Sequence, residues 1–212
     1  SATAVTVSLL TGIGTGGDNA GLESSVGVVI DGVYRPRNGV GFGDLGELER
    51  IEVLKGPQGT LFGKNTSAGV INVVTRNPDF ELGGAGEVTF GNYGALGLAG
   101  WFNAPLGDYA AFRIYAAHRD RDGWMDVVSG AGPRTEDKDY DQNFRTFRGK
   151  LLIAPTDNVE IVVSADSTKR DENCCTAVQL VSGSTAAIIN GVGGGNAIAV
   201  PANPWARVAY SN

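Results

Sequence analysis

The sequence has few of the residues that build metal sites and none of the long apolar runs that form membrane helices. One His and two Cys among 212 residues leave little for a metal site, so we predict no metal and no cofactor. No apolar stretch reaches the roughly 18 residues of a membrane helix, which excludes a helical membrane protein but not a membrane β-barrel. The 17 Lys and Arg residues are outnumbered by 23 Asp and Glu, and without a basic run no nucleic-acid partner is expected.

The sequence also lacks a recognisable catalytic arrangement. It contains no G-x-S-x-G turn and no Cys–His pair at nucleophile spacing, and the lone His118 lies among aliphatic residues, as a packing residue would. Two glycine patterns, Gly12–Gly17 and Gly41–Gly46, match G-x-G-x-x-G, but neither joins a strand to a long helix. Gly59–Asn65 lacks the spacing of a phosphate loop. We therefore predict that the chain is not an enzyme.

Glycine is abundant, with 32 residues, about twice the usual share. In residues 1–80 it separates short segments, which we interpret as a small α+β domain. Strands are predicted for four β-branched or apolar runs that end at turn residues: Ala4–Leu10, Val26–Ile30, Ile51–Leu54 and Val70–Thr75. Asp44–Arg50 begins with an N-cap residue and has acids in its first turn, which predicts a short helix, and Gly59–Phe62 is predicted to be a turn or a short helix.

Residues 81–212 alternate between apolar and polar side chains in segments of about ten residues, the length of a tilted membrane strand. Tyr109–Asp120, Arg145–Ala154 and Val159–Asp166 show the pattern most clearly. Four cations lie on the polar faces of the first two segments: Arg113, Arg119, Arg148 and Lys150. A water-filled lumen accepts such residues and a sandwich core does not, so the pattern favours an antiparallel barrel over a soluble β-sandwich, which stays open as the alternative.

The connections between these segments are alternately short and long, as in membrane barrels. Pro105–Asp108 and Pro155–Asn158 are short, Arg121–Asn143 is long and polar, and the chain after Ser167 is predicted to be long and irregular. Cys174 and Cys175 lie in this last part, where they can pair with each other or with cysteines outside this chain. The chain starts at Ser1 without a signal peptide, so we expect it to be a piece of a longer protein.

Three stretches of the first part resemble the plug domain of TonB-dependent outer-membrane receptors. They are Asp31-Gly32-Val33-Tyr34, the run LERIEVLKGPQGTLFG at Leu48–Gly63, and GVINVVT at Gly69–Thr75. Phe112-Arg113 and Arg121-Asp122-Gly123-Trp124 are similar to the first barrel hairpins of the same family. Together the resemblance covers about Gly12 to Asp166.

The resemblance implies a mainly β fold: a plug domain in residues 1–80, followed in residues 81–212 by the first strands and outer loops of a large transmembrane β-barrel. It implies a location in the bacterial outer membrane, in contact with lipid, and uptake of a scarce solute such as a ferric siderophore or other metal chelate. The implied protein partner is TonB, which supplies energy in the full-length chain. A soluble or surface β-rich binding protein without a transport role is the alternative.

The resemblance implies structural or gating roles, and no catalytic role, for the residues of the plug motif: Asp31, Gly32, Arg50, Glu52, Lys55, Gly56, Pro57, Gly59, Gly63, Gly69 and Asn72. Tyr34 and Arg35 follow a turn and are candidates for contacts with the solute. Where this chain has Thr11 and Lys55, the family commonly has arginines that latch the plug to acidic barrel residues. Thr11 has no charge and Lys55 has no bidentate fork, so the resemblance implies an altered latch.

Overall fold

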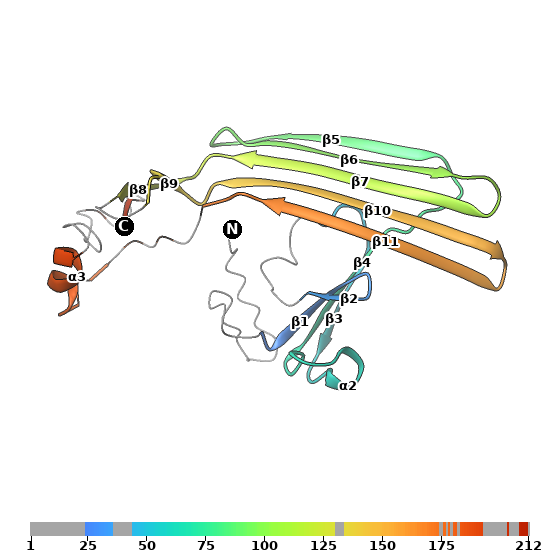
Figure 1. The fold of residues 1–212 in the computed structure, drawn as a ribbon, viewed down its shortest axis with the longest axis horizontal. Helices are drawn as coiled ribbons and strands as arrows, with labels where there is room; N and C mark the ends of the chain where they lie inside the picture. Colours follow the sequence, from blue (N-terminus) through green and yellow to red (C-terminus); the bar gives the residue numbers. More distant parts are fainter. Residues whose placement is uncertain are drawn as a thin grey trace.

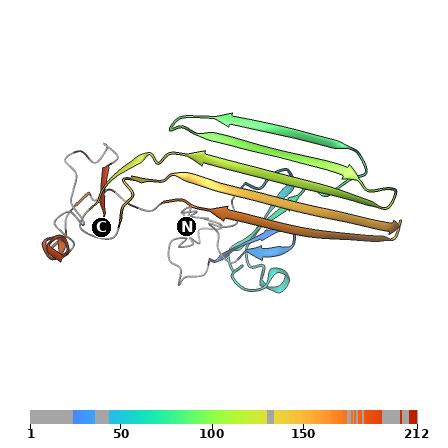
Figure 2. The same ribbon diagram turned by 45° about the horizontal axis from the view of Figure 1, so that its top comes forward.

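The computed structural model of the chain describes residues 24–35, 44–129, 134–173, 183–192 and 208–211, together with Thr176, Val178, Leu180, Val181 and Asn203. These residues form a small sheet and a large sheet, with a third sheet of short strands at one end of the large one (Figures 1 and 2). Five predictions concern residues outside this description: Ala4–Leu10, Gly12–Gly17, Thr11, Cys174 and Cys175.

The small sheet has the strand order β2-β1-β4-β3. Its strands are β1 (Val26–Ile30), β2 (Val33–Arg35), β3 (Leu48–Lys55) and β4 (Gly69–Thr75), and the short helix α2 (Gly59–Phe62) connects β3 to β4. β1 pairs with β4 in parallel, and all five of its residues are buried, as expected of an apolar run that has a neighbouring strand on each side. The strands predicted at Val26–Ile30, Ile51–Leu54 and Val70–Thr75 are therefore confirmed.

The helix predicted at Asp44–Arg50 is wrong. Residues 44–47 have an irregular conformation, and β3 begins at Leu48 and pairs with β4 in antiparallel orientation. The two acids that suggested a helix N-terminus, Asp44 and Glu47, are instead bonded to basic residues of the large sheet. Strand pairing and these ion pairs outweigh the local helix signal, which contributes only about 1 kcal/mol.

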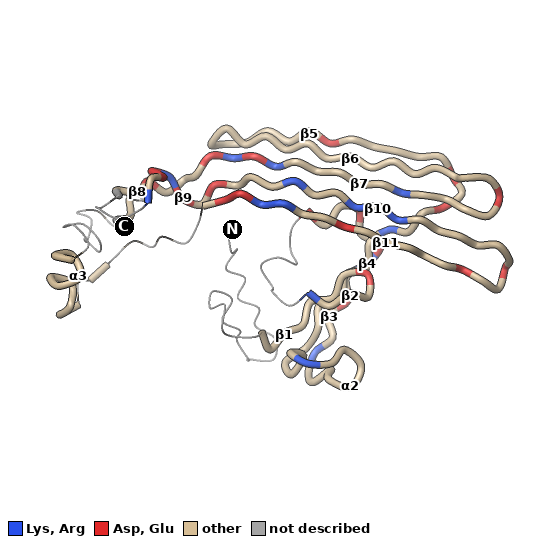
Figure 3. Tube along the Cα trace, viewed as in Figure 1, with Lys and Arg blue, Asp and Glu red and all other residues tan. Residues whose placement is uncertain are grey.

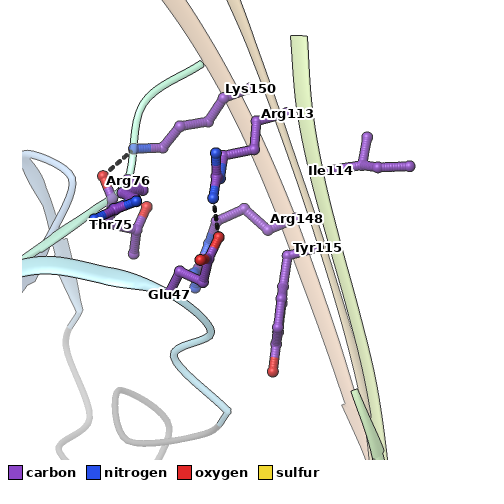
Figure 4. A pocket seen from close by; sticks show the side chains of 8 residues that line it. All are labelled: Glu47, Thr75, Arg76, Arg113, Ile114, Tyr115, Arg148 and Lys150. Carbon is purple, nitrogen blue, oxygen red and sulfur yellow. Dashed lines mark hydrogen bonds and ion pairs between the residues drawn. The ribbon is translucent and has the colours of Figure 1, made fainter. Parts of the chain in front are cut away.

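The large sheet is an antiparallel meander in the order β11-β10-β7-β6-β5. Its strands are β5 (Gly83–Phe90), β6 (Leu96–Pro105), β7 (Ala110–Arg121), β10 (Gln142–Thr156) and β11 (Val159–Arg170). The predicted alternation is confirmed, because the pairs Lys150↔Arg113 and Arg148↔Tyr115 place Arg113, Arg148 and Lys150 on one face. We call this face, which is turned toward the small sheet, the inner face (Figure 4).

The opposite, outer face of the large sheet is apolar and exposed. Its exposed apolar side chains come from all five strands: Val88, Leu98, Phe102, Ile114, Phe147, Ile161 and Val163. A soluble sandwich would bury the last strand, yet Val159, Ile161 and Val163 are 44%, 49% and 56% exposed. In the part of the chain that the structure describes, no second sheet covers this face, so the sandwich alternative does not agree with the fold.

The third sheet joins two segments that were predicted to be loops. It consists of β8 (Met125–Ser129), β9 (Lys138–Asp139) and β12 (Val208–Ser211), in the order β12-β8-β9. The chain after Ser167 is less irregular than predicted, because β11 continues to Arg170 and a helix, α3 (Ala186–Val192), precedes β12. Neither described helix is long and apolar enough to span a membrane.

The linker between the small and large sheets is fixed by one buried amide. Asn103 on β6 is only 1% exposed, and its Nδ2 donates to the backbone oxygens of Asp79 and Glu81 at 3.0 and 2.6 Å. Its Oδ1 accepts a hydrogen bond from the Asp79 amide at 3.2 Å. Because a buried amide without partners is costly, these bonds hold the start of the large sheet in a fixed position relative to β4.

Three residues of the plug motif meet on the exposed part of the small sheet. Glu52 faces Asn72 across β3 and β4, and its carboxylate accepts hydrogen bonds from Asn72 Nδ2 and Arg50 Nε, both at 2.8 Å. The bond from Arg50, followed by that from Asn72, lowers the pKa of the Glu52 carboxyl. The motif therefore supplies a charged cross-strand contact that joins β3 to the centre of the sheet.

This contact predicts a pH dependence. A lowered pKa in the folded state stabilises the fold above the unfolded carboxyl's pKa of about 4.3, and this contribution is lost as the pH falls through the folded value. We expect Glu52→Gln to lower the melting temperature at pH 7 and to have no effect in acid below the folded pKa. Glu81→Gln, which changes an exposed carboxyl of the linker, is the control. An equal effect of Glu52→Gln at pH 7 and pH 3 would contradict the assignment.

Candidate functional site: the contact between the two sheets

The small sheet meets the large sheet mainly through the four residues Asp44–Glu47, which we call the docked segment. They precede β3 and lie against the inner face, where β7 and β10 present basic and aromatic side chains. The Asp44 carboxylate receives hydrogen bonds from the Tyr115 hydroxyl and, at 2.8 Å, from Arg119 Nε. Both partners lie on the same face of β7, four residues apart with Ala117 between them, so the carboxylate bridges two separate positions of the strand.

The other end of the docked segment forms an ion pair with a buried arginine. Glu47 is paired with Arg113, whose side chain is only 7% exposed against 27% for Glu47 (Figure 4). The Arg113 guanidinium also lies over the ring of Trp101, 4.0 Å from its centroid. A buried guanidinium needs a counter-charge, so the carboxylate and the ring together make this position of Arg113 stable.

The two middle residues of the segment are held by close packing and a backbone bond. Arg148 donates a hydrogen bond to the Leu45 carbonyl oxygen. Gly46 has φ +67°, and a Cβ there would lie 2.9 Å from the Tyr115 ring. Any other residue would therefore push the segment away from the large sheet, which we call the wall. Each of the four residues is thus contacted by a side chain of β7 or β10.

A second contact lies beside the first and involves the turn after β1. Lys150 Nζ on β10 is 3.1 Å from Asp31 Oδ1 and donates to the Thr75 carbonyl oxygen at 2.9 Å and to Asn77 Oδ1 at 3.0 Å. Asp31 also accepts hydrogen bonds from the Thr75 amide and hydroxyl, at 2.8 and 2.7 Å. Asp31 and Gly32 have φ +49° and +79°, as the predicted turn requires.

The two residues predicted to contact a solute have partners inside the chain. Arg35 Nη2 is 2.6 Å from Asp166 Oδ1 on β11, which makes a fourth ion pair between the small sheet with its docked segment and the large sheet. The Tyr34 hydroxyl accepts a hydrogen bond from Asn65 Nδ2 at 3.1 Å. Both residues are half-buried, and a solute would have to compete with these contacts.

The remaining plug-motif residues shape the connection between β3 and β4, away from the docked segment (Figure 1). Gly56, Gly63 and Gly69 have φ +83°, +78° and +150°, which favour glycine. The Gly63 amide bonds to the Gly59 carbonyl at 3.1 Å and closes α2, while Pro57 and the side chain of Lys55 are exposed. Among the plug-motif residues, Asp31 thus takes part in the contact between the sheets, whereas these glycines shape a turn.

Sequence reasoning missed Asp44 and Glu47 as site residues. It had identified their partners, since Arg113, Arg119 and Arg148 were predicted to face a lumen. The usable signal was the need of these cations for counter-charges, which the acids just before the plug motif could supply. Among the described residues, no group of three or more His, Cys, Asp or Glu side chains is placed to hold a metal ion.

The Glu47–Arg113 pair gives a prediction for stability. Glu47→Gln leaves the Arg113 guanidinium buried without its counter-charge, a loss of about 2 kcal/mol after allowance for the partial exposure of Glu47. Hydrogen exchange at the Arg76 amide, which bonds to the Glu47 carbonyl at 3.1 Å, should become about 30-fold faster. Glu49→Gln is the control, because Glu49 is exposed and pairs with Arg50. Unchanged exchange in the Glu47 variant would show that the pair does not hold the segment.

Comparison with known proteins matches parts of this chain to one protein family. The family model described as "TonB-dependent Receptor Plug Domain" matches residues 8–70. The pesticin receptor of Yersinia enterocolitica is 51% identical over 35 residues, which are 16% of this chain and 5% of the receptor. The vitamin B12 transporter BtuB of Vibrio vulnificus is 36% identical over 99 residues, covering 37% of this chain and 16% of the transporter. The chain thus spans only a small part of the curated relatives it matches.

Solved structures agree with the sequence matches. The ferric yersiniabactin uptake receptor FyuA of Yersinia pestis aligns with a TM-score of 0.61 at 24% identity, over 74% of this chain and 24% of that receptor. The pyoverdine outer membrane receptor FpvA of Pseudomonas aeruginosa aligns with a TM-score of 0.57 at 21% identity, over 74% of this chain and 23% of its own. At 24% and 21% identity, these structural matches show that the chain shares the fold of the matching part of these receptors. Residues 8–70 therefore match the plug domain of TonB-dependent receptors, and the described part of the chain has the fold of a plug followed by barrel strands.

Proposed function

We propose that this chain is the plug and the first barrel strands of an outer-membrane receptor that takes up a scarce solute such as a ferric siderophore. Residues 1–80 form the plug in this proposal, and residues 81–212 form barrel strands and outer loops. The full receptor would be a transporter and not an enzyme, and would receive energy from TonB. The relatives support this, since their names describe receptors and transporters for vitamin B12 and iron chelates.

The observation that carries the proposal is the docked segment on the inner face. A lumen wide enough for a chelate leaks unless it is closed, and a plug closes it only while bound to the wall. Asp44 and Glu47 bind Arg119 and Arg113 through exchangeable ion pairs, without any covalent link. Such contacts hold the plug at rest and can be broken by a pull from one side, as a gate requires.

The exposed apolar face of the large sheet supports a membrane location. Contiguous apolar patches of this kind are rare on soluble monomers and mark contact with lipid or protein. The outer face has its aromatic and aliphatic side chains on every strand, while four cations of the central strands point inward: Arg113, Arg119, Arg148 and Lys150. We propose that this face lies against outer-membrane lipid.

The proposal is tested with the full-length receptor in cells that have or lack TonB. A photo-cross-linking amino acid at Tyr115, whose ring lies against Gly46, should join the wall to the docked segment on illumination. We expect energised uptake of a ferric siderophore to fall at least tenfold after cross-linking, with binding at the cell surface unchanged. The same amino acid at Ile114, which points away from the small sheet, is the control (Figure 4).

Uptake that continues at the original rate in fully cross-linked receptor would contradict a gating role for the segment. Uptake that is equal with and without TonB would contradict an energised transporter.

A further inference from the structure

The inner face of the large sheet has an excess of positive charge. By strand register it carries six cations among the described residues: Arg113, Arg119, Arg121, Arg148, Lys150 and Arg170. The acids at inward positions of the same sheet are three: Glu87, Glu160 and Asp166. Figure 3 shows the basic residues following β7, β10 and β11 along the sheet. The wall therefore depends on other parts of the chain for neutrality.

Four of these cations lie along one line on the inner face, which we call the cation row: Arg119, Arg148, Arg113 and Lys150. Lys150 lies opposite Arg113 and Arg148 opposite Tyr115, so these three cations occupy adjacent inward levels of β7 and β10, and the level of Ala117 and Thr146 separates them from Arg119. Arg113 and Arg119 are six residues apart on one strand, so the row is about 20 Å long. This is long enough to contact a solute at several successive points.

The small sheet supplies most of the counter-charge of the row. Glu47 neutralises Arg113, Asp44 neutralises Arg119, and Asp31 lies beside Lys150. Two acids of the wall lie near the row: Glu87, 3.2 Å from Arg119, and Asp166, which is opposite Arg148 on β11 and is paired with Arg35 of the small sheet. When the docked segment leaves the wall, Arg113 and Arg148 therefore lose the partners that the small sheet provides.

Open space adjoins the docked segment on the side of β5 and β6. A cavity of about 460 Å³ lies between Asp44, Glu87, Ala99, Trp101 and Arg119. The wall of this cavity includes Ala85, Gly86 and Gly100, which add little bulk. A small solute can thus approach the cation row from this side without displacing large side chains.

We propose that the cation row is an anion-binding track, which the docked segment occupies at rest and an anionic solute occupies during passage. This rests on the proposed transport function and names the substrate class as an anionic chelate with carboxylate or similar oxygens. Guanidinium groups bind such oxygens in bidentate geometry, and a cationic solute would be repelled by the same row. Asp44 and Glu47 act as an internal anion that the solute replaces.

The charge of the track can be measured without knowing the solute. The full-length receptor carries Cys174→Ser and Cys175→Ser, and Ala99→Cys as a target that lines the cavity. Negatively and positively charged methanethiosulfonates then report the local potential as the ratio of their reaction rates. Asp44→Asn with Glu47→Gln releases the segment, and adding Arg113→Gln with Arg148→Gln removes the centre of the row. Arg145→Gln is the matched control, because Arg145 lies on the outer face of the same strand.

We expect release of the docked segment to raise the ratio of the anionic reagent's reaction rate to the cationic reagent's rate about tenfold. This corresponds to a change in local potential of about one kT per unit charge, because the two reagents differ by two charges. Arg113→Gln with Arg148→Gln should return the ratio to near its starting value, and Arg145→Gln should leave it high. The proposed anion-binding track would be contradicted if the rate ratio stays high without Arg113 and Arg148. It would also be contradicted if Arg145→Gln lowers the ratio by the same amount.

Uptake by the wild-type receptor separates this inference from the proposed function. We expect anionic ferric citrate to compete with the native uptake more strongly than a cationic ferric trihydroxamate, and Arg148→Gln to reduce this preference at least fivefold. A receptor that takes up no iron chelate at all contradicts the proposed function, and the reagent ratio then decides the inference alone. Preference for the cationic chelate contradicts the inference and leaves the transport function intact.

Discussion

The buried cations of the inner face require counter-charges, and this requirement determines how the two sheets fit together. Arg113 is almost fully buried, and its charge is balanced by Glu47 from a segment 66 residues earlier in the chain. A buried guanidinium without a partner would cost several kcal/mol, so the small sheet can dock only where its acids meet these groups. Arg119 with Asp44 and Lys150 with Asp31 repeat the arrangement and fix the orientation of the small sheet.

The direction of these ion pairs, from acids of the small sheet to cations of the large sheet, differs from the latch that the family resemblance implied. There, plug arginines at the positions of Thr11 and Lys55 would bind acidic residues of the barrel. In this chain Lys55 is exposed, and the ion pairs of Asp44, Glu47 and Asp31 run the other way, from plug acids to wall cations. Arg35 with Asp166 keeps the expected direction. Most acids of the contact therefore come from the small sheet and its docked segment, and most cations come from the wall.

Alternating strands could be predicted from the sequence because the signal is local. The alternation with aliphatic neighbours predicted that Arg113, Arg148 and Lys150 share one face. The residue types of Asp31-Gly32 predicted a turn. The docked segment could not be predicted in the same way. Asp44 and Glu47 have the spacing of a helix start, and what decides their conformation is a set of partners more than 60 residues away. The pairing of β12 with β8 is non-local for the same reason.

A double-mutant cycle on Glu47 and Arg113 tests the central claim most directly. Hydrogen exchange at the Arg76 amide gives the free energy of opening in the wild-type receptor, in Glu47→Gln, in Arg113→Gln and in the double variant. Two groups that neutralise each other in a buried site should be coupled by more than about 1 kcal/mol, so the double variant should be more stable than the sum of the single changes predicts. Additive effects, with a coupling near zero, would contradict the claim that this pair holds the plug to the wall.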